Sequence, residues 1–197
     1  MLQMNYYADT WVLDDCCPCD MHFNDWVDAQ NLRNKTIFHF GTGVHHIVGI
    51  RQATRQNRVL GITASKNEYT DYIELASKNA AVARYYIAYF GDIYLTKPEL
   101  LPSFDVVTLF HLCEYFHKST GSEEYGGLTD LGVLDLFAGK IVPGGHILFY
   151  TKSRSWEQAS EVVGVWEKTA PVIRVGEFKT LLVYAKTMGS ALCKLSP

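Results

Sequence analysis

Short apolar runs alternate with helical stretches along most of the chain, and this alternation constrains the fold more than any other feature. Residues 37–40 read as a buried strand that ends at Gly41 and Gly43. A helical stretch at 44–56 follows, and residues 58–63 (RVLGIT) are again short, apolar and β-branched. Parallel strands need crossover connections, which helices supply. This order therefore predicts a parallel sheet with helices on both faces.

The alternation continues toward the C-terminus. Helices are predicted at 66–82, 128–138 and 156–166, and strands at 86–90, 104–110 and 146–151, the last after a turn at residues 143–145. Residues 172–175 and 179–185, separated by Gly176, predict an antiparallel pair. We expect an α/β fold: a doubly wound, mostly parallel seven-stranded Rossmann-like sheet with a C-terminal antiparallel strand pair. Residues 36–197 would form this domain, and residues 1–35 an N-terminal cap or lid segment.

Length and charge narrow the class of protein. The chain has 197 residues and is 48% hydrophobic, which fits one domain with a sizeable core. Its 18 basic and 21 acidic residues give a net charge of -3, so no strong field favours a nucleic acid as partner. No signal-peptide pattern or membrane-spanning stretch is read from the sequence, and the odd number of cysteines favours reduced thiols. These features predict a cytoplasmic protein without a membrane partner.

Several segments, in order, resemble the motifs of class I S-adenosylmethionine-dependent methyltransferases. Residues 37–43 resemble the first strand and its Gly-x-Gly loop, residues 59–65 the second strand, and residues 141–149 (IVPGGHILF) the turn that opens the fifth strand. The resemblance spans residues 36–186. It implies methyl transfer with S-adenosylmethionine as cofactor. It also implies that Gly41, Thr42 and Gly43 lie beside the methionine part of the cofactor, and Asp92 beside the adenine.

The chain departs from that family's pattern at two positions. His39 stands where the family usually has an acidic residue, two positions before the first glycine. Thr63 replaces the acidic residue that, in the family, binds both ribose hydroxyls. A hydroxyl binds more weakly than a carboxylate, because charge-assisted hydrogen bonds are roughly twice as strong as neutral ones. Ser65 and Glu68 are the candidates for the missing contact, and the sequence does not decide between them.

The acceptor side of the site is expected just after the strand at 104–110, where His111 and Glu114 follow. A histidine titrates near ~6.5, so His111 is the first candidate for a general base, with Glu114 beside it. The alternative interpretation is that His111 and Glu114 have only a structural or solvent-exposed role in a short helix. We expect a small-molecule acceptor, and the sequence leaves a homodimer open.

Three other functions compete with methyl transfer. A degenerate, non-catalytic member of the fold that acts as a partner or regulatory subunit would explain His39 and Thr63. Dinucleotide binding expects a third glycine where the chain has His46, so it ranks lower. Aminopropyl transfer would need an acidic polyamine pocket, for which only Glu123, Glu124 and Asp130 are candidates.

One cluster of metal-binding residue types lies near the N-terminus. The spacing of Cys16, Cys19 and His22 resembles half of a zinc knuckle. A fourth ligand is not evident, and Cys17 would face elsewhere if the other three converged. The favoured interpretation is a reduced, half-buried loop, so no metal site is predicted.

Overall fold

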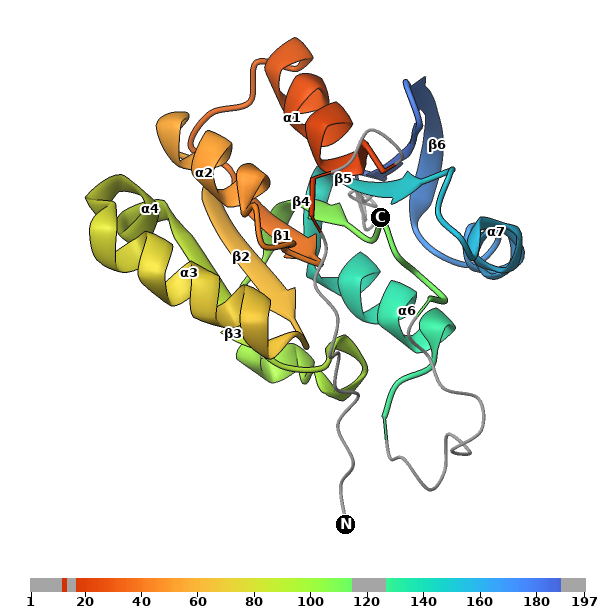
Figure 1. Cartoon of the computed structure of the whole chain (residues 1–197). Coiled ribbons are helices and arrows are strands. Elements are labelled where there is room, and N and C mark those ends of the chain that lie inside the picture. The colour runs from red at the N-terminus through yellow and green to blue at the C-terminus, as the bar shows by residue number, and fades with distance from the viewer. Residues whose placement is uncertain (1–11, 14–16, 115–126, 189–197) are drawn as a thin grey trace, which may run out of the picture.

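The computed structural model describes residues 12–13, 17–114 and 127–188, and it forms a sheet with helices on both sides (Figure 1). The sheet runs in the order β3-β2-β1-β4-β5-β7-β6, in which β1 to β5 are parallel and β7 is antiparallel to both β5 and β6. The predicted sheet and its C-terminal strand pair are therefore confirmed. The strands are β1 (Thr36–Phe40), β2 (Arg58–Thr63), β3 (Tyr86–Phe90), β4 (Phe104–Thr108), β5 (Ile141–Tyr150), β6 (Val172–Phe178) and β7 (Leu181–Lys186).

Helices cover both faces of the sheet, as a parallel sheet requires. The helices are α1 (Cys19–Ala29), α2 (Ile47–Thr54), α3 (Lys66–Lys78) and α4 (Ala80–Tyr85) on one face, and α6 (Asp130–Lys140) and α7 (Trp156–Trp166) on the other. Two 3-10 turns, η1 (Ile93–Leu95) and η2 (Pro98–Leu100), follow β3. In the described part of the chain, no helix is long and apolar enough to cross a membrane.

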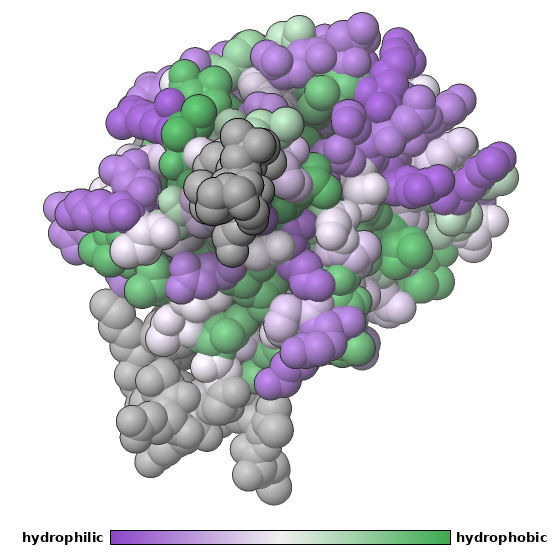
Figure 2. Space-filling view, turned by 180° about the vertical axis from the view of Figure 1, so that it is seen from behind, coloured by the Kyte–Doolittle hydropathy of each residue, from purple (hydrophilic) through white to green (hydrophobic). Residues whose placement is uncertain are grey.

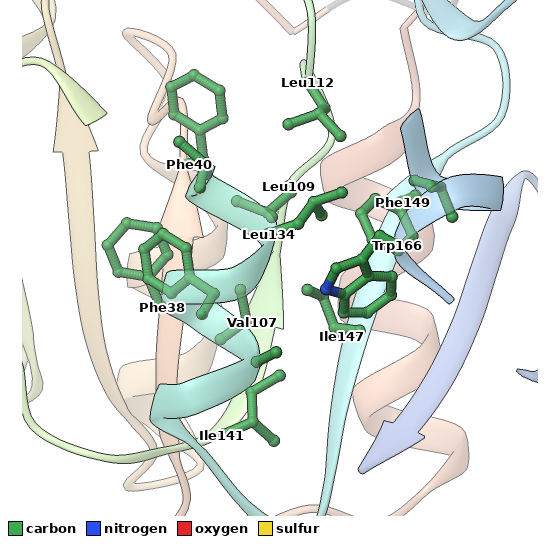
Figure 3. Close-up of a cluster of buried hydrophobic side chains, with 14 of the residues drawn as sticks. Phe38, Phe40, Val107, Leu109, Leu112, Leu134, Ile141, Ile147, Phe149 and Trp166 are labelled. Atoms are coloured by element: carbon green, nitrogen blue, oxygen red, sulfur yellow. The ribbon is translucent and has the colours of Figure 1, made fainter. Parts of the chain in front are cut away.

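The core consists of two apolar clusters, one on each side of the sheet. Phe38 of β1, Leu134 of α6 and Trp166 of α7 lie in the first cluster and are fully buried (Figure 3). The second cluster contains Phe23 and Val27 of α1, both fully buried. Burial of each such side chain contributes about 1.5–3 kcal/mol. The α1 helix, predicted as part of a cap or lid, therefore packs into the core and is held firmly against the sheet.

Polar and apolar residues are interspersed on the face shown in Figure 2. The large apolar side chains exposed in the described residues are spread over several elements, among them Ile73 of α3, Val165 of α7, and Ile173 with Val175 of β6. Single exposed apolar residues are normal on a protein surface and need no partner to explain them.

Two predicted helix boundaries were wrong, and in both cases one residue explains the difference. The predicted helix at 44–56 begins only at Ile47, because His46 adopts a left-handed backbone conformation (φ +44°). The predicted helix at 66–82 is interrupted at Asn79. The Asn79 side chain accepts hydrogen bonds from the backbone N–H groups of Ala81 and Val82, both at 3.1 Å, and so starts α4 as a new helix.

The predicted C-terminal turns also differ from the structure. Residues 143–145 lie inside β5 rather than before it, and the pairing of β4 with β5 shifts register between Phe104 and Val106 to accommodate them. Gly176 lies inside β6, at a second register shift, and does not separate the two strands. Glycines are tolerated in strands where pairing is locally irregular.

Candidate cofactor and acceptor cavity

A cavity lies at the C-terminal ends of the central strands, where an open α/β sheet usually binds its ligand. It holds about 800 Å³ of empty space, part of it open to solvent. Six of the predicted site residues line it: Gly41, Gly43, Thr63, Ser65, Asp92 and His111. Thr42 and Glu114 lie behind this layer, in contact with residues that line the cavity. Sequence analysis missed Cys17, Cys19 and Asp20, which line it from the start of α1.

The glycine loop after β1 needs its glycines for conformation and for space. Gly41 has φ +83° and Gly43 has φ +57°, values that side-chain-bearing residues rarely adopt. A Cβ on Gly43 would lie 2.4 Å from Nε2 of His45. A side chain at Gly43 would therefore strain the backbone and displace the His45 ring, and glycine lets the backbone itself line the cavity.

Glu68 supplies the carboxylate that the end of β2 lacks. Its side chain is buried, lines the cavity, and accepts hydrogen bonds at Oε2 from the Thr63 hydroxyl (2.6 Å) and the Thr42 hydroxyl (3.1 Å). Ser65 instead caps α3, since its Oγ accepts from the Glu68 backbone N–H at 3.4 Å. Of the two candidates for the missing contact, Glu68 brings a carboxyl group to the cavity, and Ser65 caps the helix that holds it.

His46 ties the glycine loop to the start of α3. Its Nε2 donates to the backbone oxygen of Glu68 (2.9 Å), and its Nδ1 lies 2.9 Å from the hydroxyl of Tyr86. Burial lowers the pKa of His46 to about 4. A neutral ring can donate at Nε2 and accept the Tyr86 proton at Nδ1, so His46 is a structural link, as its buried position indicates.

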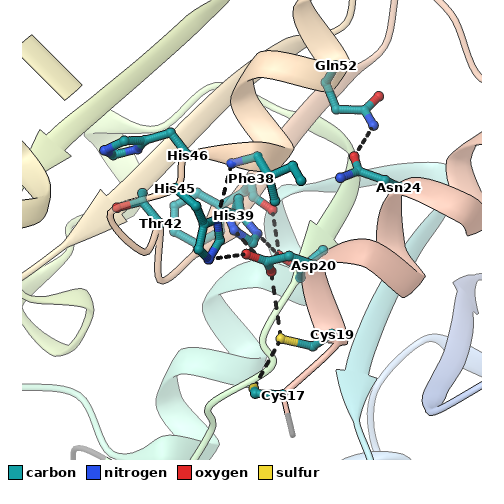
Figure 4. A network of polar contacts seen from close by, with 12 residues as sticks. Cys17, Cys19, Asp20, Asn24, Phe38, His39, Thr42, His45, His46 and Gln52 are labelled. Atoms are coloured by element: carbon teal, nitrogen blue, oxygen red, sulfur yellow. Dashed lines mark hydrogen bonds and ion pairs between the residues drawn. The ribbon is translucent and has the colours of Figure 1, made fainter. Parts of the chain in front are cut away.

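The Asp20 carboxylate lies beside His39, the other position at which the chain departs from the family pattern (Figure 4). Oδ1 of Asp20 lies 3.6 Å from Nε2 of His39, and its Oδ2 lies 3.7 Å from Nε2 of His45. The other ring nitrogen of His39 lies 2.8 Å from the Thr108 hydroxyl. Burial alone would raise the pKa of Asp20, but His39, His45 and His111 outweigh it and lower that pKa. A carboxylate thus reaches the glycine loop from α1 instead of from β1.

Cys17, Cys19 and His111 form the other wall of the cavity. The two sulfur atoms lie 3.7 Å apart, and the hydrogen bond from Cys19 lowers the pKa of Cys17 to about 6. Nδ1 of His111 lies 3.1 Å from Oε2 of Glu114. Burial alone would lower the pKa of His111, but the hydrogen bond and charge of Glu114 outweigh it and raise that pKa. The predicted pair of His111 and Glu114 is therefore in contact.

The third wall is apolar and ends in an acidic group. Ile62, Ile93 and Tyr94 line the cavity beside Asp92, which is buried. Oδ1 of Asp92 accepts a hydrogen bond from the backbone N–H of Tyr94 at 2.9 Å and so starts η1. A flat aromatic ligand with polar edges fits such a wall.

Two weaker expectations can be compared with the structure. Cys19 lies beside Cys17 rather than His22, whose Nδ1 instead lies 2.7 Å from the Thr180 hydroxyl. Asp130 accepts hydrogen bonds from the Tyr94 hydroxyl and the Cys113 N–H, so it is a structural residue. Cys16, Glu123 and Glu124 lie outside the described residues.

Comparison with known proteins gives similarity in structure only. No protein-family model matches the chain, and no curated protein matches its sequence. The N-methyltransferase NodS from Bradyrhizobium japonicum WM9, in complex with S-adenosyl-L-homocysteine, is similar over 86% of this chain and 87% of its own, with a TM-score of 0.61 and 10% identity.

Two further solved structures agree. Magnesium protoporphyrin IX methyltransferase (ChlM) from Synechocystis PCC 6803, with bound SAM, has a TM-score of 0.60 at 12% identity and covers 91% of this chain and 87% of its own. A methyltransferase from Pyrococcus furiosus has the same TM-score and identity, over 95% of this chain and 90% of its own. With this sheet order, its antiparallel C-terminal pair and these neighbours, the chain has the fold of the class I S-adenosylmethionine-dependent methyltransferases.

Proposed function

We propose that the protein transfers a methyl group from S-adenosylmethionine to a small-molecule acceptor. When bound, this cofactor supplies an electrophilic methyl group on a sulfonium ion. The chain's own residues would bind and orient it: Gly41 and Gly43 beside the methionine part, Glu68 at the ribose, and Asp92 with the apolar wall at the adenine.

The observation that carries this proposal is the position of two carboxylates. The sequence lacks the family's acidic residues at 39 and 63, yet Asp20 lies beside His39 and Glu68 beside Thr63, and both carboxylates line the cavity. Burying a charge is costly unless it is paired or hydrogen-bonded, and both carboxylates have such partners at the wall of the cavity. Glu68 would accept hydrogen bonds from the ribose hydroxyls, with Thr63 and Thr42 holding it in place.

His111 and Glu114 would serve the acceptor. His111 lines the cavity next to the glycine loop, since a Cβ on Gly41 would lie 3.6 Å from its ring. Glu114 holds the imidazole in position and makes it a stronger base. His111 would accept the proton that an acceptor group loses as it is methylated.

The alternative of a degenerate partner protein receives no support from the cavity. That alternative expects either that side chains fill the site or that it binds a different ligand, and the structure leaves the site open and lined with buried polar groups.

The test is isothermal titration of the full chain with S-adenosylmethionine and with S-adenosyl-L-homocysteine. We expect both to bind, and Glu68→Gln to weaken binding by about 10- to 100-fold, because one hydrogen bond to a charged group contributes about 1.5–3 kcal/mol. Glu74→Gln is the matched control, since Glu74 lies exposed on the same helix and pairs with Lys78. Absence of binding by the unmodified protein would refute the proposal.

A further inference from the structure

Three metal-ligating side chains converge at the mouth of the cavity. The ligand atoms of Cys17, Cys19 and His111 all lie within 4.8 Å of one another. The two sulfur atoms are 3.7 Å apart. In a tetrahedral zinc site with Zn–S bonds of about 2.3 Å, two sulfur ligands lie about 3.8 Å apart. The two cysteines therefore already have the spacing that one zinc ion requires.

The convergence is built by the core and does not depend on local spacing alone. Cys17 and Cys19 stand at the start of α1, whereas His111 follows β4. Phe23, one turn into α1, packs edge-on against Phe110 with ring centroids 6.0 Å apart. Both aromatic rings are fully buried. This contact fixes the start of α1 against the residue that precedes His111.

The residues around the three ligands match the usual surroundings of a metal site. A metal-bound histidine commonly donates its other ring N–H to a carboxylate, which sets its orientation. Glu114 takes this place, with Oε2 3.1 Å from Nδ1 of His111, so that coordination would use Nε2. Glu114 is itself held at Oε1 by the backbone N–H of Arg154 at 3.1 Å. The Cys19 thiol donates to Oδ1 of Asp20 at 3.7 Å, and a bound zinc ion would displace this proton.

We propose that Cys17, Cys19 and His111 bind a zinc ion whose fourth coordination position faces the cavity. Two thiolates and one imidazole favour a soft or borderline metal, and three protein ligands with an open position are typical of zinc that contacts a substrate. Two thiolates would also neutralise the charge of the ion, and their protons would pass to solvent. All three residues line the cavity, so a water or a soft donor atom of a ligand can complete the site.

The zinc site can be tested apart from methyl transfer, although it shares His111 with the proposed acceptor side of the cavity. With zinc bound, His111 is a ligand and no longer a base, so metal content decides which of its two roles operates. A zinc ion at this wall would bind and orient an acceptor through a sulfur, nitrogen or oxygen atom and lower the pKa of that group.

Cobalt substitution tests the site without any acceptor or cofactor. The full chain is freed of metal with a chelator, kept reduced with a phosphine, and titrated with Co²⁺. We expect a thiolate-to-cobalt charge-transfer band and the visible bands of tetrahedral cobalt, saturating at one ion per chain and abolished by added Zn²⁺. Cys17→Ser and His111→Ala should each lose the charge-transfer band or its tetrahedral pattern, and Glu114→Gln should weaken zinc binding by about 10- to 100-fold.

Matched variants separate this site from other arrangements. Cys113→Ser removes a buried cysteine away from the cavity, and His22→Ala removes a histidine on α1 that contacts Thr180, so both should keep the spectrum. Cys16→Ser should also keep it, and a small added thiol should shift it by entering the open position. No tetrahedral cobalt spectrum, or a spectrum that survives both Cys17→Ser and His111→Ala, would overturn the zinc site. A spectrum lost in Cys16→Ser would show that the fourth position is not open.

Discussion

The two halves of the cavity are built in different ways. The oxygen-lined half, formed by Thr63, Ser65, Glu68 and Asp92, comes from two neighbouring connections, after β2 and after β3. The sulfur and imidazole half, formed by Cys17, Cys19, His45 and His111, depends on the packing of α1 against the sheet. The first half follows from the fold, whereas the second is specific to this chain. A cofactor common to the fold belongs in the first half, and chemistry particular to this protein in the second.

Gly43→Val should have the largest effect, because Gly43 lines the cavity in the glycine loop that follows β1. A valine there must adopt φ near +57° and place its Cβ 2.4 Å from Nε2 of His45. We expect S-adenosyl-L-homocysteine to bind more than about 100-fold more weakly, by isothermal titration. Gly139→Val is the control, because a Cβ at Gly139 meets no atom within 4 Å. Equal losses in both variants would contradict the account.

Acid should destabilise the protein at His46, which is hydrogen-bonded to the backbone of Glu68 in the oxygen-lined half. The pKa of His46 falls from an ordinary 6.5 to about 4 in the folded state, so the unfolded chain binds the proton more tightly. The stability contributed by the neutral ring is complete above pH 6.5 and is lost as the pH falls toward 4, by at most about 3 kcal/mol. Urea unfolding across this range should show that slope, and His46→Gln should reduce it. An unchanged slope in His46→Gln would assign the pH dependence to other groups.

Ser65→Ala should have a smaller effect, of about 1 kcal/mol in the free energy of unfolding, through loss of a helix cap. It should also weaken S-adenosyl-L-homocysteine binding, since Ser65 starts the turn that places Glu68. Asn79→Ala removes the cap of α4, away from the cavity, and should cost similar stability without weakening the ligand. Thermal unfolding and titration of both variants make the comparison. If Asn79→Ala weakened binding as much as Ser65→Ala does, the effect of Ser65 on the ligand would come from lost stability and not from the position of Glu68.

The smallest effect is expected when a residue in one half of the cavity is substituted and ligand or metal binding in the other half is measured. Cys17→Ser should leave the affinity for S-adenosyl-L-homocysteine within about threefold, because Cys17 belongs to the sulfur and imidazole half. Glu68→Gln should likewise leave the cobalt spectrum unchanged. Strong coupling in either direction would mean that the two halves form one site.

The strands of the sheet could be predicted from the sequence because each is marked by a short local run of apolar and β-branched residues. Residues 104–108 are rich in apolar and β-branched side chains, and each strand in this part of the chain is followed by a helix or a turn, so the sequence pattern identified them. The predicted helix boundaries were wrong where a single residue determines the start of a helix, as at His46 and Asn79. Neither the left-handed φ of His46 nor the cap made by Asn79 has a unique signature in one sequence.

The oxygen-lined half of the candidate site was predicted from local patterns, whereas of the sulfur and imidazole half only His111 was predicted as a site residue. Glu68 follows Ser65 by three positions, the spacing of a capping box, and this pattern could have placed it at the start of a helix next to the end of β2. Asp20, Cys17 and Cys19 carried no such signal, because their place depends on how Phe23 and Val27 pack against the sheet. Tertiary packing of this kind cannot be read from spacing along the chain.

The central claim is that Glu68 has taken over the role of the acidic residue missing at position 63. The most direct test returns the carboxylate to position 63 in the double variant Thr63→Asp, Glu68→Gln. The affinity of this variant for S-adenosyl-L-homocysteine is measured by isothermal titration and compared with that of Glu68→Gln. The account predicts weak binding in the single variant and recovery of most of the lost affinity in the double variant. If Glu68→Gln bound as tightly as the unmodified protein, or if the added aspartate restored nothing, the claim would be contradicted.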